Sequence, residues 1–411
     1  MAAVHEFDGG LLLCASSSVF LAKNSHDKLS VTGSFNSKGV LRSILSTNGL
    51  VRGYVEQLSN PTTVDADVQI LCSTVSNCRS LLAVGTSEKV VIILEARTLT
   101  MRRSFRVPKA PTSITFDKDD SHIVVGDRAG HVRRYTVEPS EKCGYTDMNG
   151  EECTFEGEPL SGAVTMILDV AISRDGNFLL AADRDEKIRA YVVQSYCLGH
   201  TAYVSSMALL GNRLFSSGGD SIVIEWDMES GKGVSRSGKL GEPPVRRIIV
   251  IEKVVFSFVF HFPLGVLTAI LFAQERQDRT FFVIAAVGPT LHVLDERLQS
   301  VTSIEISQTI MDIAFVDGSL IGVSSDFSAG VTRFGLFDGT SSAIEIPNEV
   351  CQALLLSKDP ISNYFKNVVH QNTLDYYKRK AEKLGGIEVN LRRKRKVVNL
   401  LGEVEDEKRF T

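Results

Sequence analysis

The sequence contains none of the short motifs that mark common enzymes. It has no G-x-G-x-x-G after a strand, no P-loop, no H-E-x-x-H and no G-x-S-x-G. Its eight histidines are scattered and show no spacing that suits metal ligands. The sequence therefore predicts a chain that presents surfaces to other molecules, with no catalytic residues, no metal and no cofactor of its own.

Cysteine occurs seven times but never as C-x-x-C, which argues against a disulfide framework or a zinc ribbon. The first ten residues, MAAVHEFDGG, lack the positive charges that open a secretory signal, so none is expected. Residues 254–273 hold no Asp, Glu, Lys or Arg and approach the length of a membrane span. The turn-forming Pro263 and Gly265 in its middle favour two buried strands, with a membrane helix or a gene-model error as alternatives. We expect no association with a membrane.

Charge is distributed unevenly along the chain of 411 residues, although its net charge is only −4. Residues 376–396 contain nine lysines and arginines and two glutamates, whereas the other residues carry 36 basic and 47 acidic side chains. The body is acidic and one C-terminal stretch is strongly basic. Coating of nucleic acid by the whole surface is therefore excluded.

One unit repeats along the chain: a strand, a small polar turn, and a second strand that ends in a bulky apolar residue. Successive ends are 40, 41, 56, 35, 68 and 40 residues apart. A period of about 40 residues with short strands is typical of the blades of a WD40 β-propeller. The seven terminal residues are Tyr54, Leu94, Tyr135, Tyr191, Trp226, Leu294 and Phe334.

The blade that ends at Trp226 is the most explicit copy, because it opens with Gly199-His200 and closes with Trp226-Asp227. We expect its polar side chains to be buried together and joined by hydrogen bonds, since buried polar groups need partners. The expected structural set is His200, Asp220, Trp226 and either Ser216 or Ser217.

These repeats predict an all-β chain, a seven-bladed propeller over residues 1–358. A ring of sheets must close, so we expect a strand from residues 3–22 to pair with the last blade, at about 311–356. An acidic insertion, residues 138–162, is expected to be a solvated loop. Residues 359–411 are predicted to form a C-terminal helical extension and basic tail.

The densest charged feature is the run Asp183-Arg184-Asp185-Glu186-Lys187-Ile188-Arg189. It occupies a turn between two strands and the start of the second strand. Alternation places Lys187 and Arg189 on one face and Ile188 on the other. Asp185 and Glu186 at the turn tip are then free to meet a basic partner. Composition alone favours the alternative, an ordinary polar blade turn in which Asp183 bonds to the local backbone.

The C-terminal stretch has a predicted helix followed by five successive basic residues. Such clusters serve as nuclear localisation signals and as phosphate-binding surfaces. We predict both uses, nuclear localisation and binding of nucleic-acid phosphates, for Lys378, Arg379, Lys380, Lys383, Arg392, Arg393, Lys394, Arg395 and Lys396.

Residues 167–207 closely resemble the WD-repeat, non-catalytic subunit of the tRNA (guanine-N7) methyltransferase, the Wuho family. The specific part is the run D-R-D-E-K-I-R followed by C-L-G-H-T. Weaker similarity covers residues 68–235, and the basic C-terminus has the same layout, whereas residues 240–345 match poorly.

The resemblance implies a non-catalytic scaffold and a heterodimer with a separate catalytic subunit, which binds S-adenosylmethionine. The resemblance further implies that the pair makes N7-methylguanosine in the variable loop of tRNA and that the WD-repeat subunit stabilises its partner and helps to seat the tRNA. It therefore assigns tRNA binding to the basic C-terminal residues named above. By similarity, Asp185, Glu186, Lys187 and Arg189 map onto the partner-binding run.

Two other functions are open to a propeller without catalytic motifs. A substrate receptor of a ubiquitin ligase often carries Arg two residues after the W-D pair, whereas Met228 and Glu229 follow it here. A general protein-assembly scaffold predicts several protein partners and no tRNA in the complex.

Overall fold

The computed structural model describes residues 1–38, 68–138, 157–252 and 281–359, apart from 8–9, 26–27, 192–194, 317–318, 325–329 and 336–338. One compact unit spans Met1–Lys358. The predicted C-terminal helices, every basic residue assigned to tRNA binding, and the uncharged segment 254–273 lie outside the described residues.

The described chain folds into seven four-stranded antiparallel sheets, each made of four consecutive strands. Blade 1 contains β1 (Ala2–Phe7), β2 (Gly10–Ala15), β3 (Ser18–Ser25) and β4 (Lys28–Asn36), and blade 2 contains β5 (Ile70–Val75), β6 (Leu81–Thr86), β7 (Val90–Glu95) and β8 (Met101–Arg106). Blade 3 contains β9 (Pro111–Phe116), β10 (His122–Asp127), β11 (His131–Thr136) and β12 (Glu158–Gly162), and blade 4 contains β13 (Ile167–Ile172), β14 (Leu179–Asp183), β15 (Lys187–Tyr191) and β16 (Ser195–Leu198).

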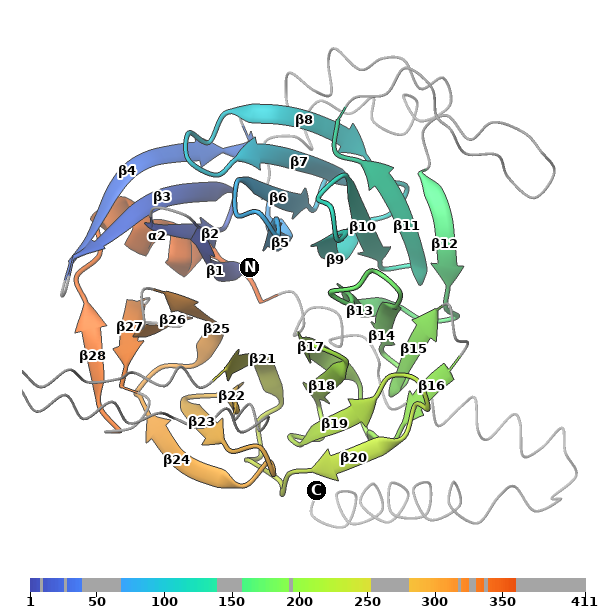
Figure 1. Ribbon diagram of the computed structural model, residues 1–411. Coiled ribbons are helices and arrows are strands. Elements are labelled where there is room, and N and C mark those ends of the chain that lie inside the picture. The colour runs from blue at the N-terminus through green and yellow to red at the C-terminus, as the bar shows by residue number, and fades with distance from the viewer. Residues whose placement is uncertain are drawn as a thin grey trace, which may run out of the picture. The chain divides into compact units, whose positions relative to one another are not determined.

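Blade 5 contains β17 (Val204–Leu210), β18 (Arg213–Gly218), β19 (Val223–Asp227) and β20 (Gly233–Arg236). Blade 6 contains β21 (Val245–Glu252), β22 (Phe281–Val287), β23 (Thr290–Leu294) and β24 (Ser300–Glu305). Blade 7 contains β25 (Ile310–Val316), β26 (Ser319–Ser324), β27 (Gly330–Phe334) and β28 (Ser341–Ile344), and helix α2 (Asn348–Leu356) follows it. Figure 1 shows the sheets around a central axis, with the first strand of each blade innermost.

The sequence repeat correctly predicts the seven-bladed all-β fold. Six of the seven predicted terminal residues lie in the third strand of a blade: Leu94, Tyr135, Tyr191, Trp226, Leu294 and Phe334. The seventh, Tyr54, lies outside the described residues. Part of the acidic insertion predicted as a loop is also strand, because Glu158–Gly162 forms β12 and pairs with β11.

The predicted closure of the ring is wrong. The N-terminal strand β1 pairs with β2 in its own blade, and blade 7 is complete without it. Residues 2–36 form three successive hairpins with two-residue connections, so local pairing forms a full sheet before the distant β25 is needed. Blades 1 and 7 instead meet at the perimeter, where Leu29 N donates to Glu345 O (2.8 Å) and Lys28 Nζ lies 3.0 Å from Glu345 Oε1.

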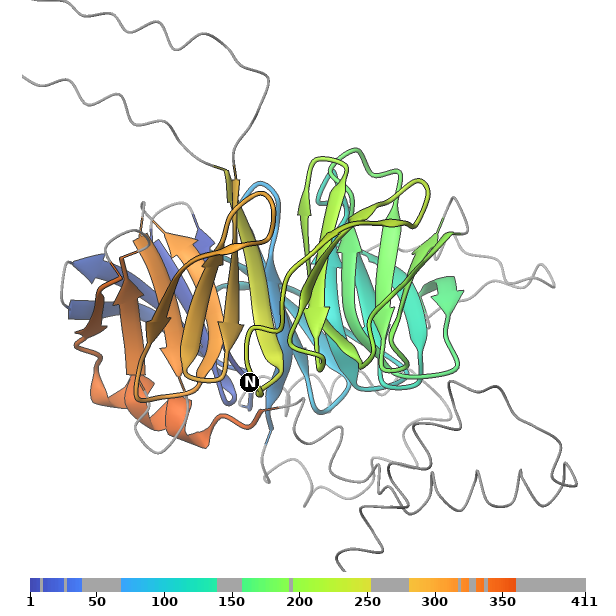
Figure 2. The ribbon, with the colours of Figure 1, turned by 90° about the horizontal axis from the view of Figure 1, so that it is seen from below.

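Residues 348–356, predicted as part of an all-β last blade, instead form helix α2, which also joins blades 1 and 7. It begins after Pro347 with Glu349 in its first turn, a favourable position for an acidic residue at a helix N-terminus. Val350 and Leu354 are fully buried among residues of both blades. Beyond the helix, Ser357 Oγ accepts a hydrogen bond from Ser16 N (2.8 Å), in the turn after β2. Figure 2 shows α2 on one face of the ring.

Polar side chains on the innermost strands join neighbouring blades. Asp312 in blade 7 accepts a hydrogen bond from Val4 N in blade 1 (3.0 Å) and lies 3.4 Å from Arg247 in blade 6. Burial raises the pKa of Asp312, although Arg247 opposes the shift. Further links are His5 Nε2 with Ser73 Oγ, Ser113 Oγ to Asp169 Oδ1, Met207 N to Asp169 Oδ2, and Ile248 N to Ser206 Oγ.

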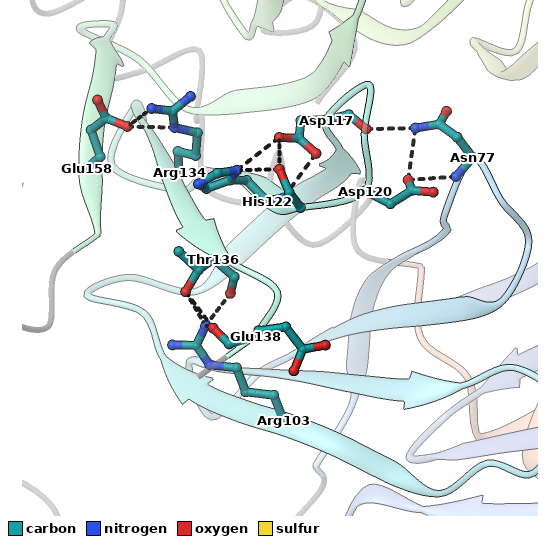
Figure 3. Close-up of polar contacts among 10 residues, drawn as sticks. Asn77, Arg103, Asp117, Asp120, His122, Arg134, Thr136, Glu138 and Glu158 are labelled. Carbon is teal, nitrogen blue, oxygen red and sulfur yellow. Dashed lines mark hydrogen bonds and ion pairs between the residues drawn. The ribbon is translucent and has the colours of Figure 1, made fainter. Parts of the chain in front are cut away.

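Blades 2 and 3 are also joined through the turns between their first and second strands. Asn77 N and Nδ2 donate to Asp120 Oδ1 (2.8 and 2.9 Å), and Asn77 Nδ2 donates to Asp117 O (2.7 Å). Figure 3 shows these contacts beside Arg103, which bonds to Thr136, and Arg134, which pairs with Glu158. Neighbouring blades are therefore joined both along their inner strands and through their turns. This makes the ring a rigid support for its surface turns.

In blade 5, hydrogen bonds through Ser216 join His200 of the G-H pair to Trp226 of the W-D pair. His200 Nδ1 lies 2.9 Å from Asp220 Oδ2, and His200 Nε2 lies 2.7 Å from Ser216 Oγ. Trp226 Nε1 donates to the same hydroxyl at 2.7 Å. Of the two serines considered, Ser216 belongs to the set, whereas the Ser217 hydroxyl donates to Ile222 O.

We expect Ser216→Ala to lower the free energy of unfolding by about 1–3 kcal/mol, because two buried ring nitrogens lose their partner. Ser217→Ala is the matched control. It removes an adjacent, equally buried hydroxyl that makes a single donated bond to a carbonyl, so its expected loss is about 1 kcal/mol. Denaturant titration measures both, and equal losses would contradict a shared role for Ser216.

Candidate functional site

The charged run lies at the edge of blade 4, in the turn between β14 and β15. Asp183 is only 1% exposed, and its Oδ1 accepts hydrogen bonds from Asp185 N (2.9 Å) and Lys187 N (3.2 Å). Glu186 adopts a left-handed backbone with φ of 72°. A buried carboxylate thus fixes the turn, and the side chains at its tip are presented by a preformed backbone.

Blade 3 contains the same construction. Asp127 Oδ1 accepts hydrogen bonds from Ala129 N (2.8 Å) and His131 N (3.0 Å), and Gly130 holds the left-handed position with φ of 92°. The buried aspartate is therefore a device of this fold and not specific to one function. What distinguishes the blade 4 turn is its tip, where Asp185 and Glu186 replace Ala129 and Gly130.

The strand β15 separates the run into two faces, as predicted. Ile188 is fully buried in the core between blades 4 and 5, whereas Lys187 is exposed. Asp185 is also exposed, and Glu186 is half-buried. We call the exposed and half-exposed side chains of Asp185, Glu186 and Lys187 the charged rim.

Arg189 shares the face of Lys187 but is engaged within the chain. Its Nη2 lies 3.4 Å from Asp183 Oδ2, and its Nη1 donates to Gly162 O at 3.4 Å. Its guanidinium lies over the Tyr196 ring, 5.8 Å from the centroid, a cation–π arrangement. Arg189 therefore braces the turn and the neighbouring strands, a role that its position in the run did not reveal.

The surface beside the rim contains apolar residues that the sequence analysis missed. Tyr196 and Leu198 on β16 are 52% and 63% exposed, and Val164 in the loop before β13 is 95% exposed. The sequence indicates their exposure only weakly. A four-residue strand with alternating large side chains has the same pattern whether its outer face is buried or exposed to solvent.

Among the described residues, Ser, His and Asp side chains meet in two blades. In blade 5 the Ser216 hydroxyl is fully buried and also accepts the Trp226 Nε1 hydrogen bond, so it is a structural group that no substrate reaches. The second group lies in blade 3. Asp117 Oδ2 and Ser121 Oγ both approach His122 Nδ1, at 3.0 and 2.8 Å. A hydrolytic triad needs the hydroxyl and the carboxylate on different ring nitrogens, so that the imidazole passes a proton between them. The arrangement beside Asn77 in Figure 3 is therefore a turn contact. Within the described ranges, no group of three or more His, Cys, Asp or Glu is placed to hold a metal ion.

No helix in the described part of the chain is long and apolar enough to cross a membrane.

The fold and the charged rim define a WD40 propeller that presents a preformed polar turn at its edge. Residues 133–333, from β11 to β27, match the family model described as the tRNA methyltransferase TRM82 WD40 domain. The chain belongs to the family of tRNA (guanine-N(7)-)-methyltransferase non-catalytic subunits, since it is 33% identical over 358 residues to the member from Caenorhabditis elegans, covering 80% of this chain and 81% of that protein.

Other relatives match over shorter stretches. The non-catalytic subunit WDR4 of Homo sapiens is 31% identical over 172 residues, which is 40% of this chain and 39% of that protein. The subunit wuho of Aedes aegypti is 30% identical over 192 residues, covering 41% and 44%. A chain in a crystal structure of the mitotic checkpoint complex superposes with a TM-score of 0.53 at 14% identity, covering 77% of this chain and 83% of that chain, a likeness of fold alone.

Proposed function

We propose that this chain is the non-catalytic subunit of a tRNA (guanine-N7-)-methyltransferase. It forms a heterodimer with a separate catalytic subunit and helps to seat tRNA for N7-methylguanosine formation in the variable loop. The observation that carries the proposal is the 33% identity that extends over four fifths of a relative with that name. S-adenosylmethionine is assigned to the catalytic subunit and the complex to the nucleus.

The geometry of blade 4 supports the charged rim as the contact with the catalytic subunit. Its backbone is fixed by Asp183 before any partner arrives, so little conformational entropy is lost on binding. Charges of both signs at adjacent positions favour one orientation of the partner, because a misplaced partner meets like charges. The basic C-terminal residues remain the proposed contact with tRNA phosphates.

The rim is tested by reversing one of its charges. Lys187→Glu is expected to weaken binding of the catalytic subunit about tenfold, because complementary charge is replaced by repulsion. Isothermal titration calorimetry of the two purified subunits measures the affinity. Lys89→Glu is the matched control, since Lys89 is also exposed and lies in the corresponding turn of blade 2. An unchanged affinity for the Lys187 variant would remove the rim from the interface.

A further inference from the structure

Large exposed apolar side chains are few in the described part of the chain, and three of eight flank the charged rim. They are Val164, Tyr196 and Leu198, which we call the apolar strip. Single exposed apolar residues are normal on a protein surface, whereas a group of them marks a binding site more often. None of the three belongs to one of the buried core clusters.

The strip is continuous with the charged rim. In the pairing of β15 with β16, Lys187 lies opposite Leu198, and Arg189 lies opposite Tyr196. Residues that are directly opposite in antiparallel strands project from the same face of the sheet. The charged end of Lys187 and the apolar side chain of Leu198 therefore lie on one exposed face.

Arg189 connects Tyr196 to the loop of Val164. Its guanidinium lies over the Tyr196 ring, while Nη1 donates to the carbonyl of Gly162, two residues before Val164. The strip thus crosses from the end of blade 3 to the outer strand of blade 4. Arg189 therefore also positions Tyr196, while its predicted contact with the partner stays a prediction.

The other face of the same strands is buried in the core between blades 4 and 5. Ile188 and Cys197, which lie opposite each other, are fully buried with Trp226 and other residues of blade 5. The exposure of Tyr196 and Leu198 therefore does not come from a poorly formed blade. It comes from the position of β16 as the outermost strand, beyond which the described chain has no further strand in this sheet.

We infer that the apolar strip is the centre of the surface that docks the catalytic subunit, with the charged rim at its border. The inference rests on the proposed function and names its contact. Tyrosine is enriched among the few central residues that contribute most of the binding energy of an interface, whereas solvated border charges contribute orientation. The matching surface on the catalytic subunit carries an apolar side chain next to a carboxylate that pairs with Lys187.

The test compares the strip with an exposed apolar residue elsewhere on the ring. Tyr196→Ser and Leu198→Ser are each expected to weaken binding of the purified catalytic subunit about tenfold or more. Tyr196→Phe keeps the ring beneath Arg189 and is expected to bind like the wild type. Val301→Ser is the matched control, because Val301 is 54% exposed on β24, the outer strand of blade 6. Thermal unfolding of each variant verifies its folding.

The outcomes separate the inference from the proposed function. If the wild-type subunits bind and the serine variants bind equally well, the strip is not the docking centre, and the proposed function stands. If the wild-type subunits form no complex, both fail. Light scattering of the isolated chain provides a third result: a dimer that the serine variants abolish, without a change in affinity for the catalytic subunit, would assign the strip to a second copy and overturn the inference.

Discussion

Added to its catalytic subunit, this chain is expected to raise methylation of guanine N7 in tRNA by about tenfold or more, which corresponds to ~1.4 kcal/mol of activation free energy. On its own it is expected to transfer no methyl group. The physical reason is that a preformed propeller edge holds the catalytic subunit in one arrangement, so that bound tRNA meets the reacting groups in a fixed orientation. Transfer of radiolabelled methyl groups from S-adenosylmethionine to tRNA measures both results.

The control for this experiment is the chain with Lys187→Glu. Because the substitution is expected to weaken binding only, this variant should reach the same maximal rate at higher concentration, whereas Lys89→Glu should behave like the wild type. Methyl transfer by the isolated chain, or full activity of the catalytic subunit without it, would contradict the proposed role.

Leu354→Ala is expected to lower the free energy of unfolding by about 2–5 kcal/mol, the usual cost of truncating a fully buried leucine. The effect is large because Leu354 fills the junction of blades 1 and 7, where no shared strand closes the ring. The adjacent Leu355 is 41% exposed, so Leu355→Ala is the matched control with an expected loss below about 0.5 kcal/mol.

Denaturant titration of both variants compares the two positions on the same helix. Equal, small losses would show that α2 does not stabilise the closure of the ring. In that case the perimeter contact between Lys28 and Glu345 and the bond from Val4 to Asp312 would be sufficient to hold blades 1 and 7 together.

Much of the fold was predictable because each blade repeats one local pattern. The bulky residue at the end of each copy, such as Leu94 or Phe334, falls in a third strand because this strand is buried between neighbouring blades. The closure was not predictable in the same way. Whether β1 pairs with β2 or with a strand more than 300 residues away depends on short turns that the sequence pattern at residues 2–36 shows only weakly.

The candidate site was partly predictable. The exposed turn at Asp185 and Glu186 follows from a polar turn between two apolar strands, but the engagement of Arg189 with Asp183 and Tyr196 depends on the three-dimensional packing. The hydrogen bonds between the innermost strands of neighbouring blades were also predictable from a repeated sequence pattern. Asp169 and Asp312 occupy the same place in two similar strands, ILDVAI and IMDIAF, and a repeated carboxylate in an apolar strand indicates a repeated buried partner.

The central claim is that this propeller acts in a pair with a methyltransferase, and native mass spectrometry of the complex purified from its cells tests it most directly. We predict one copy of this chain with one copy of a methyltransferase subunit, and tRNA bound to the pair. Recovery of the chain with ligase adaptors or other proteins, and without a methyltransferase, would contradict the claim.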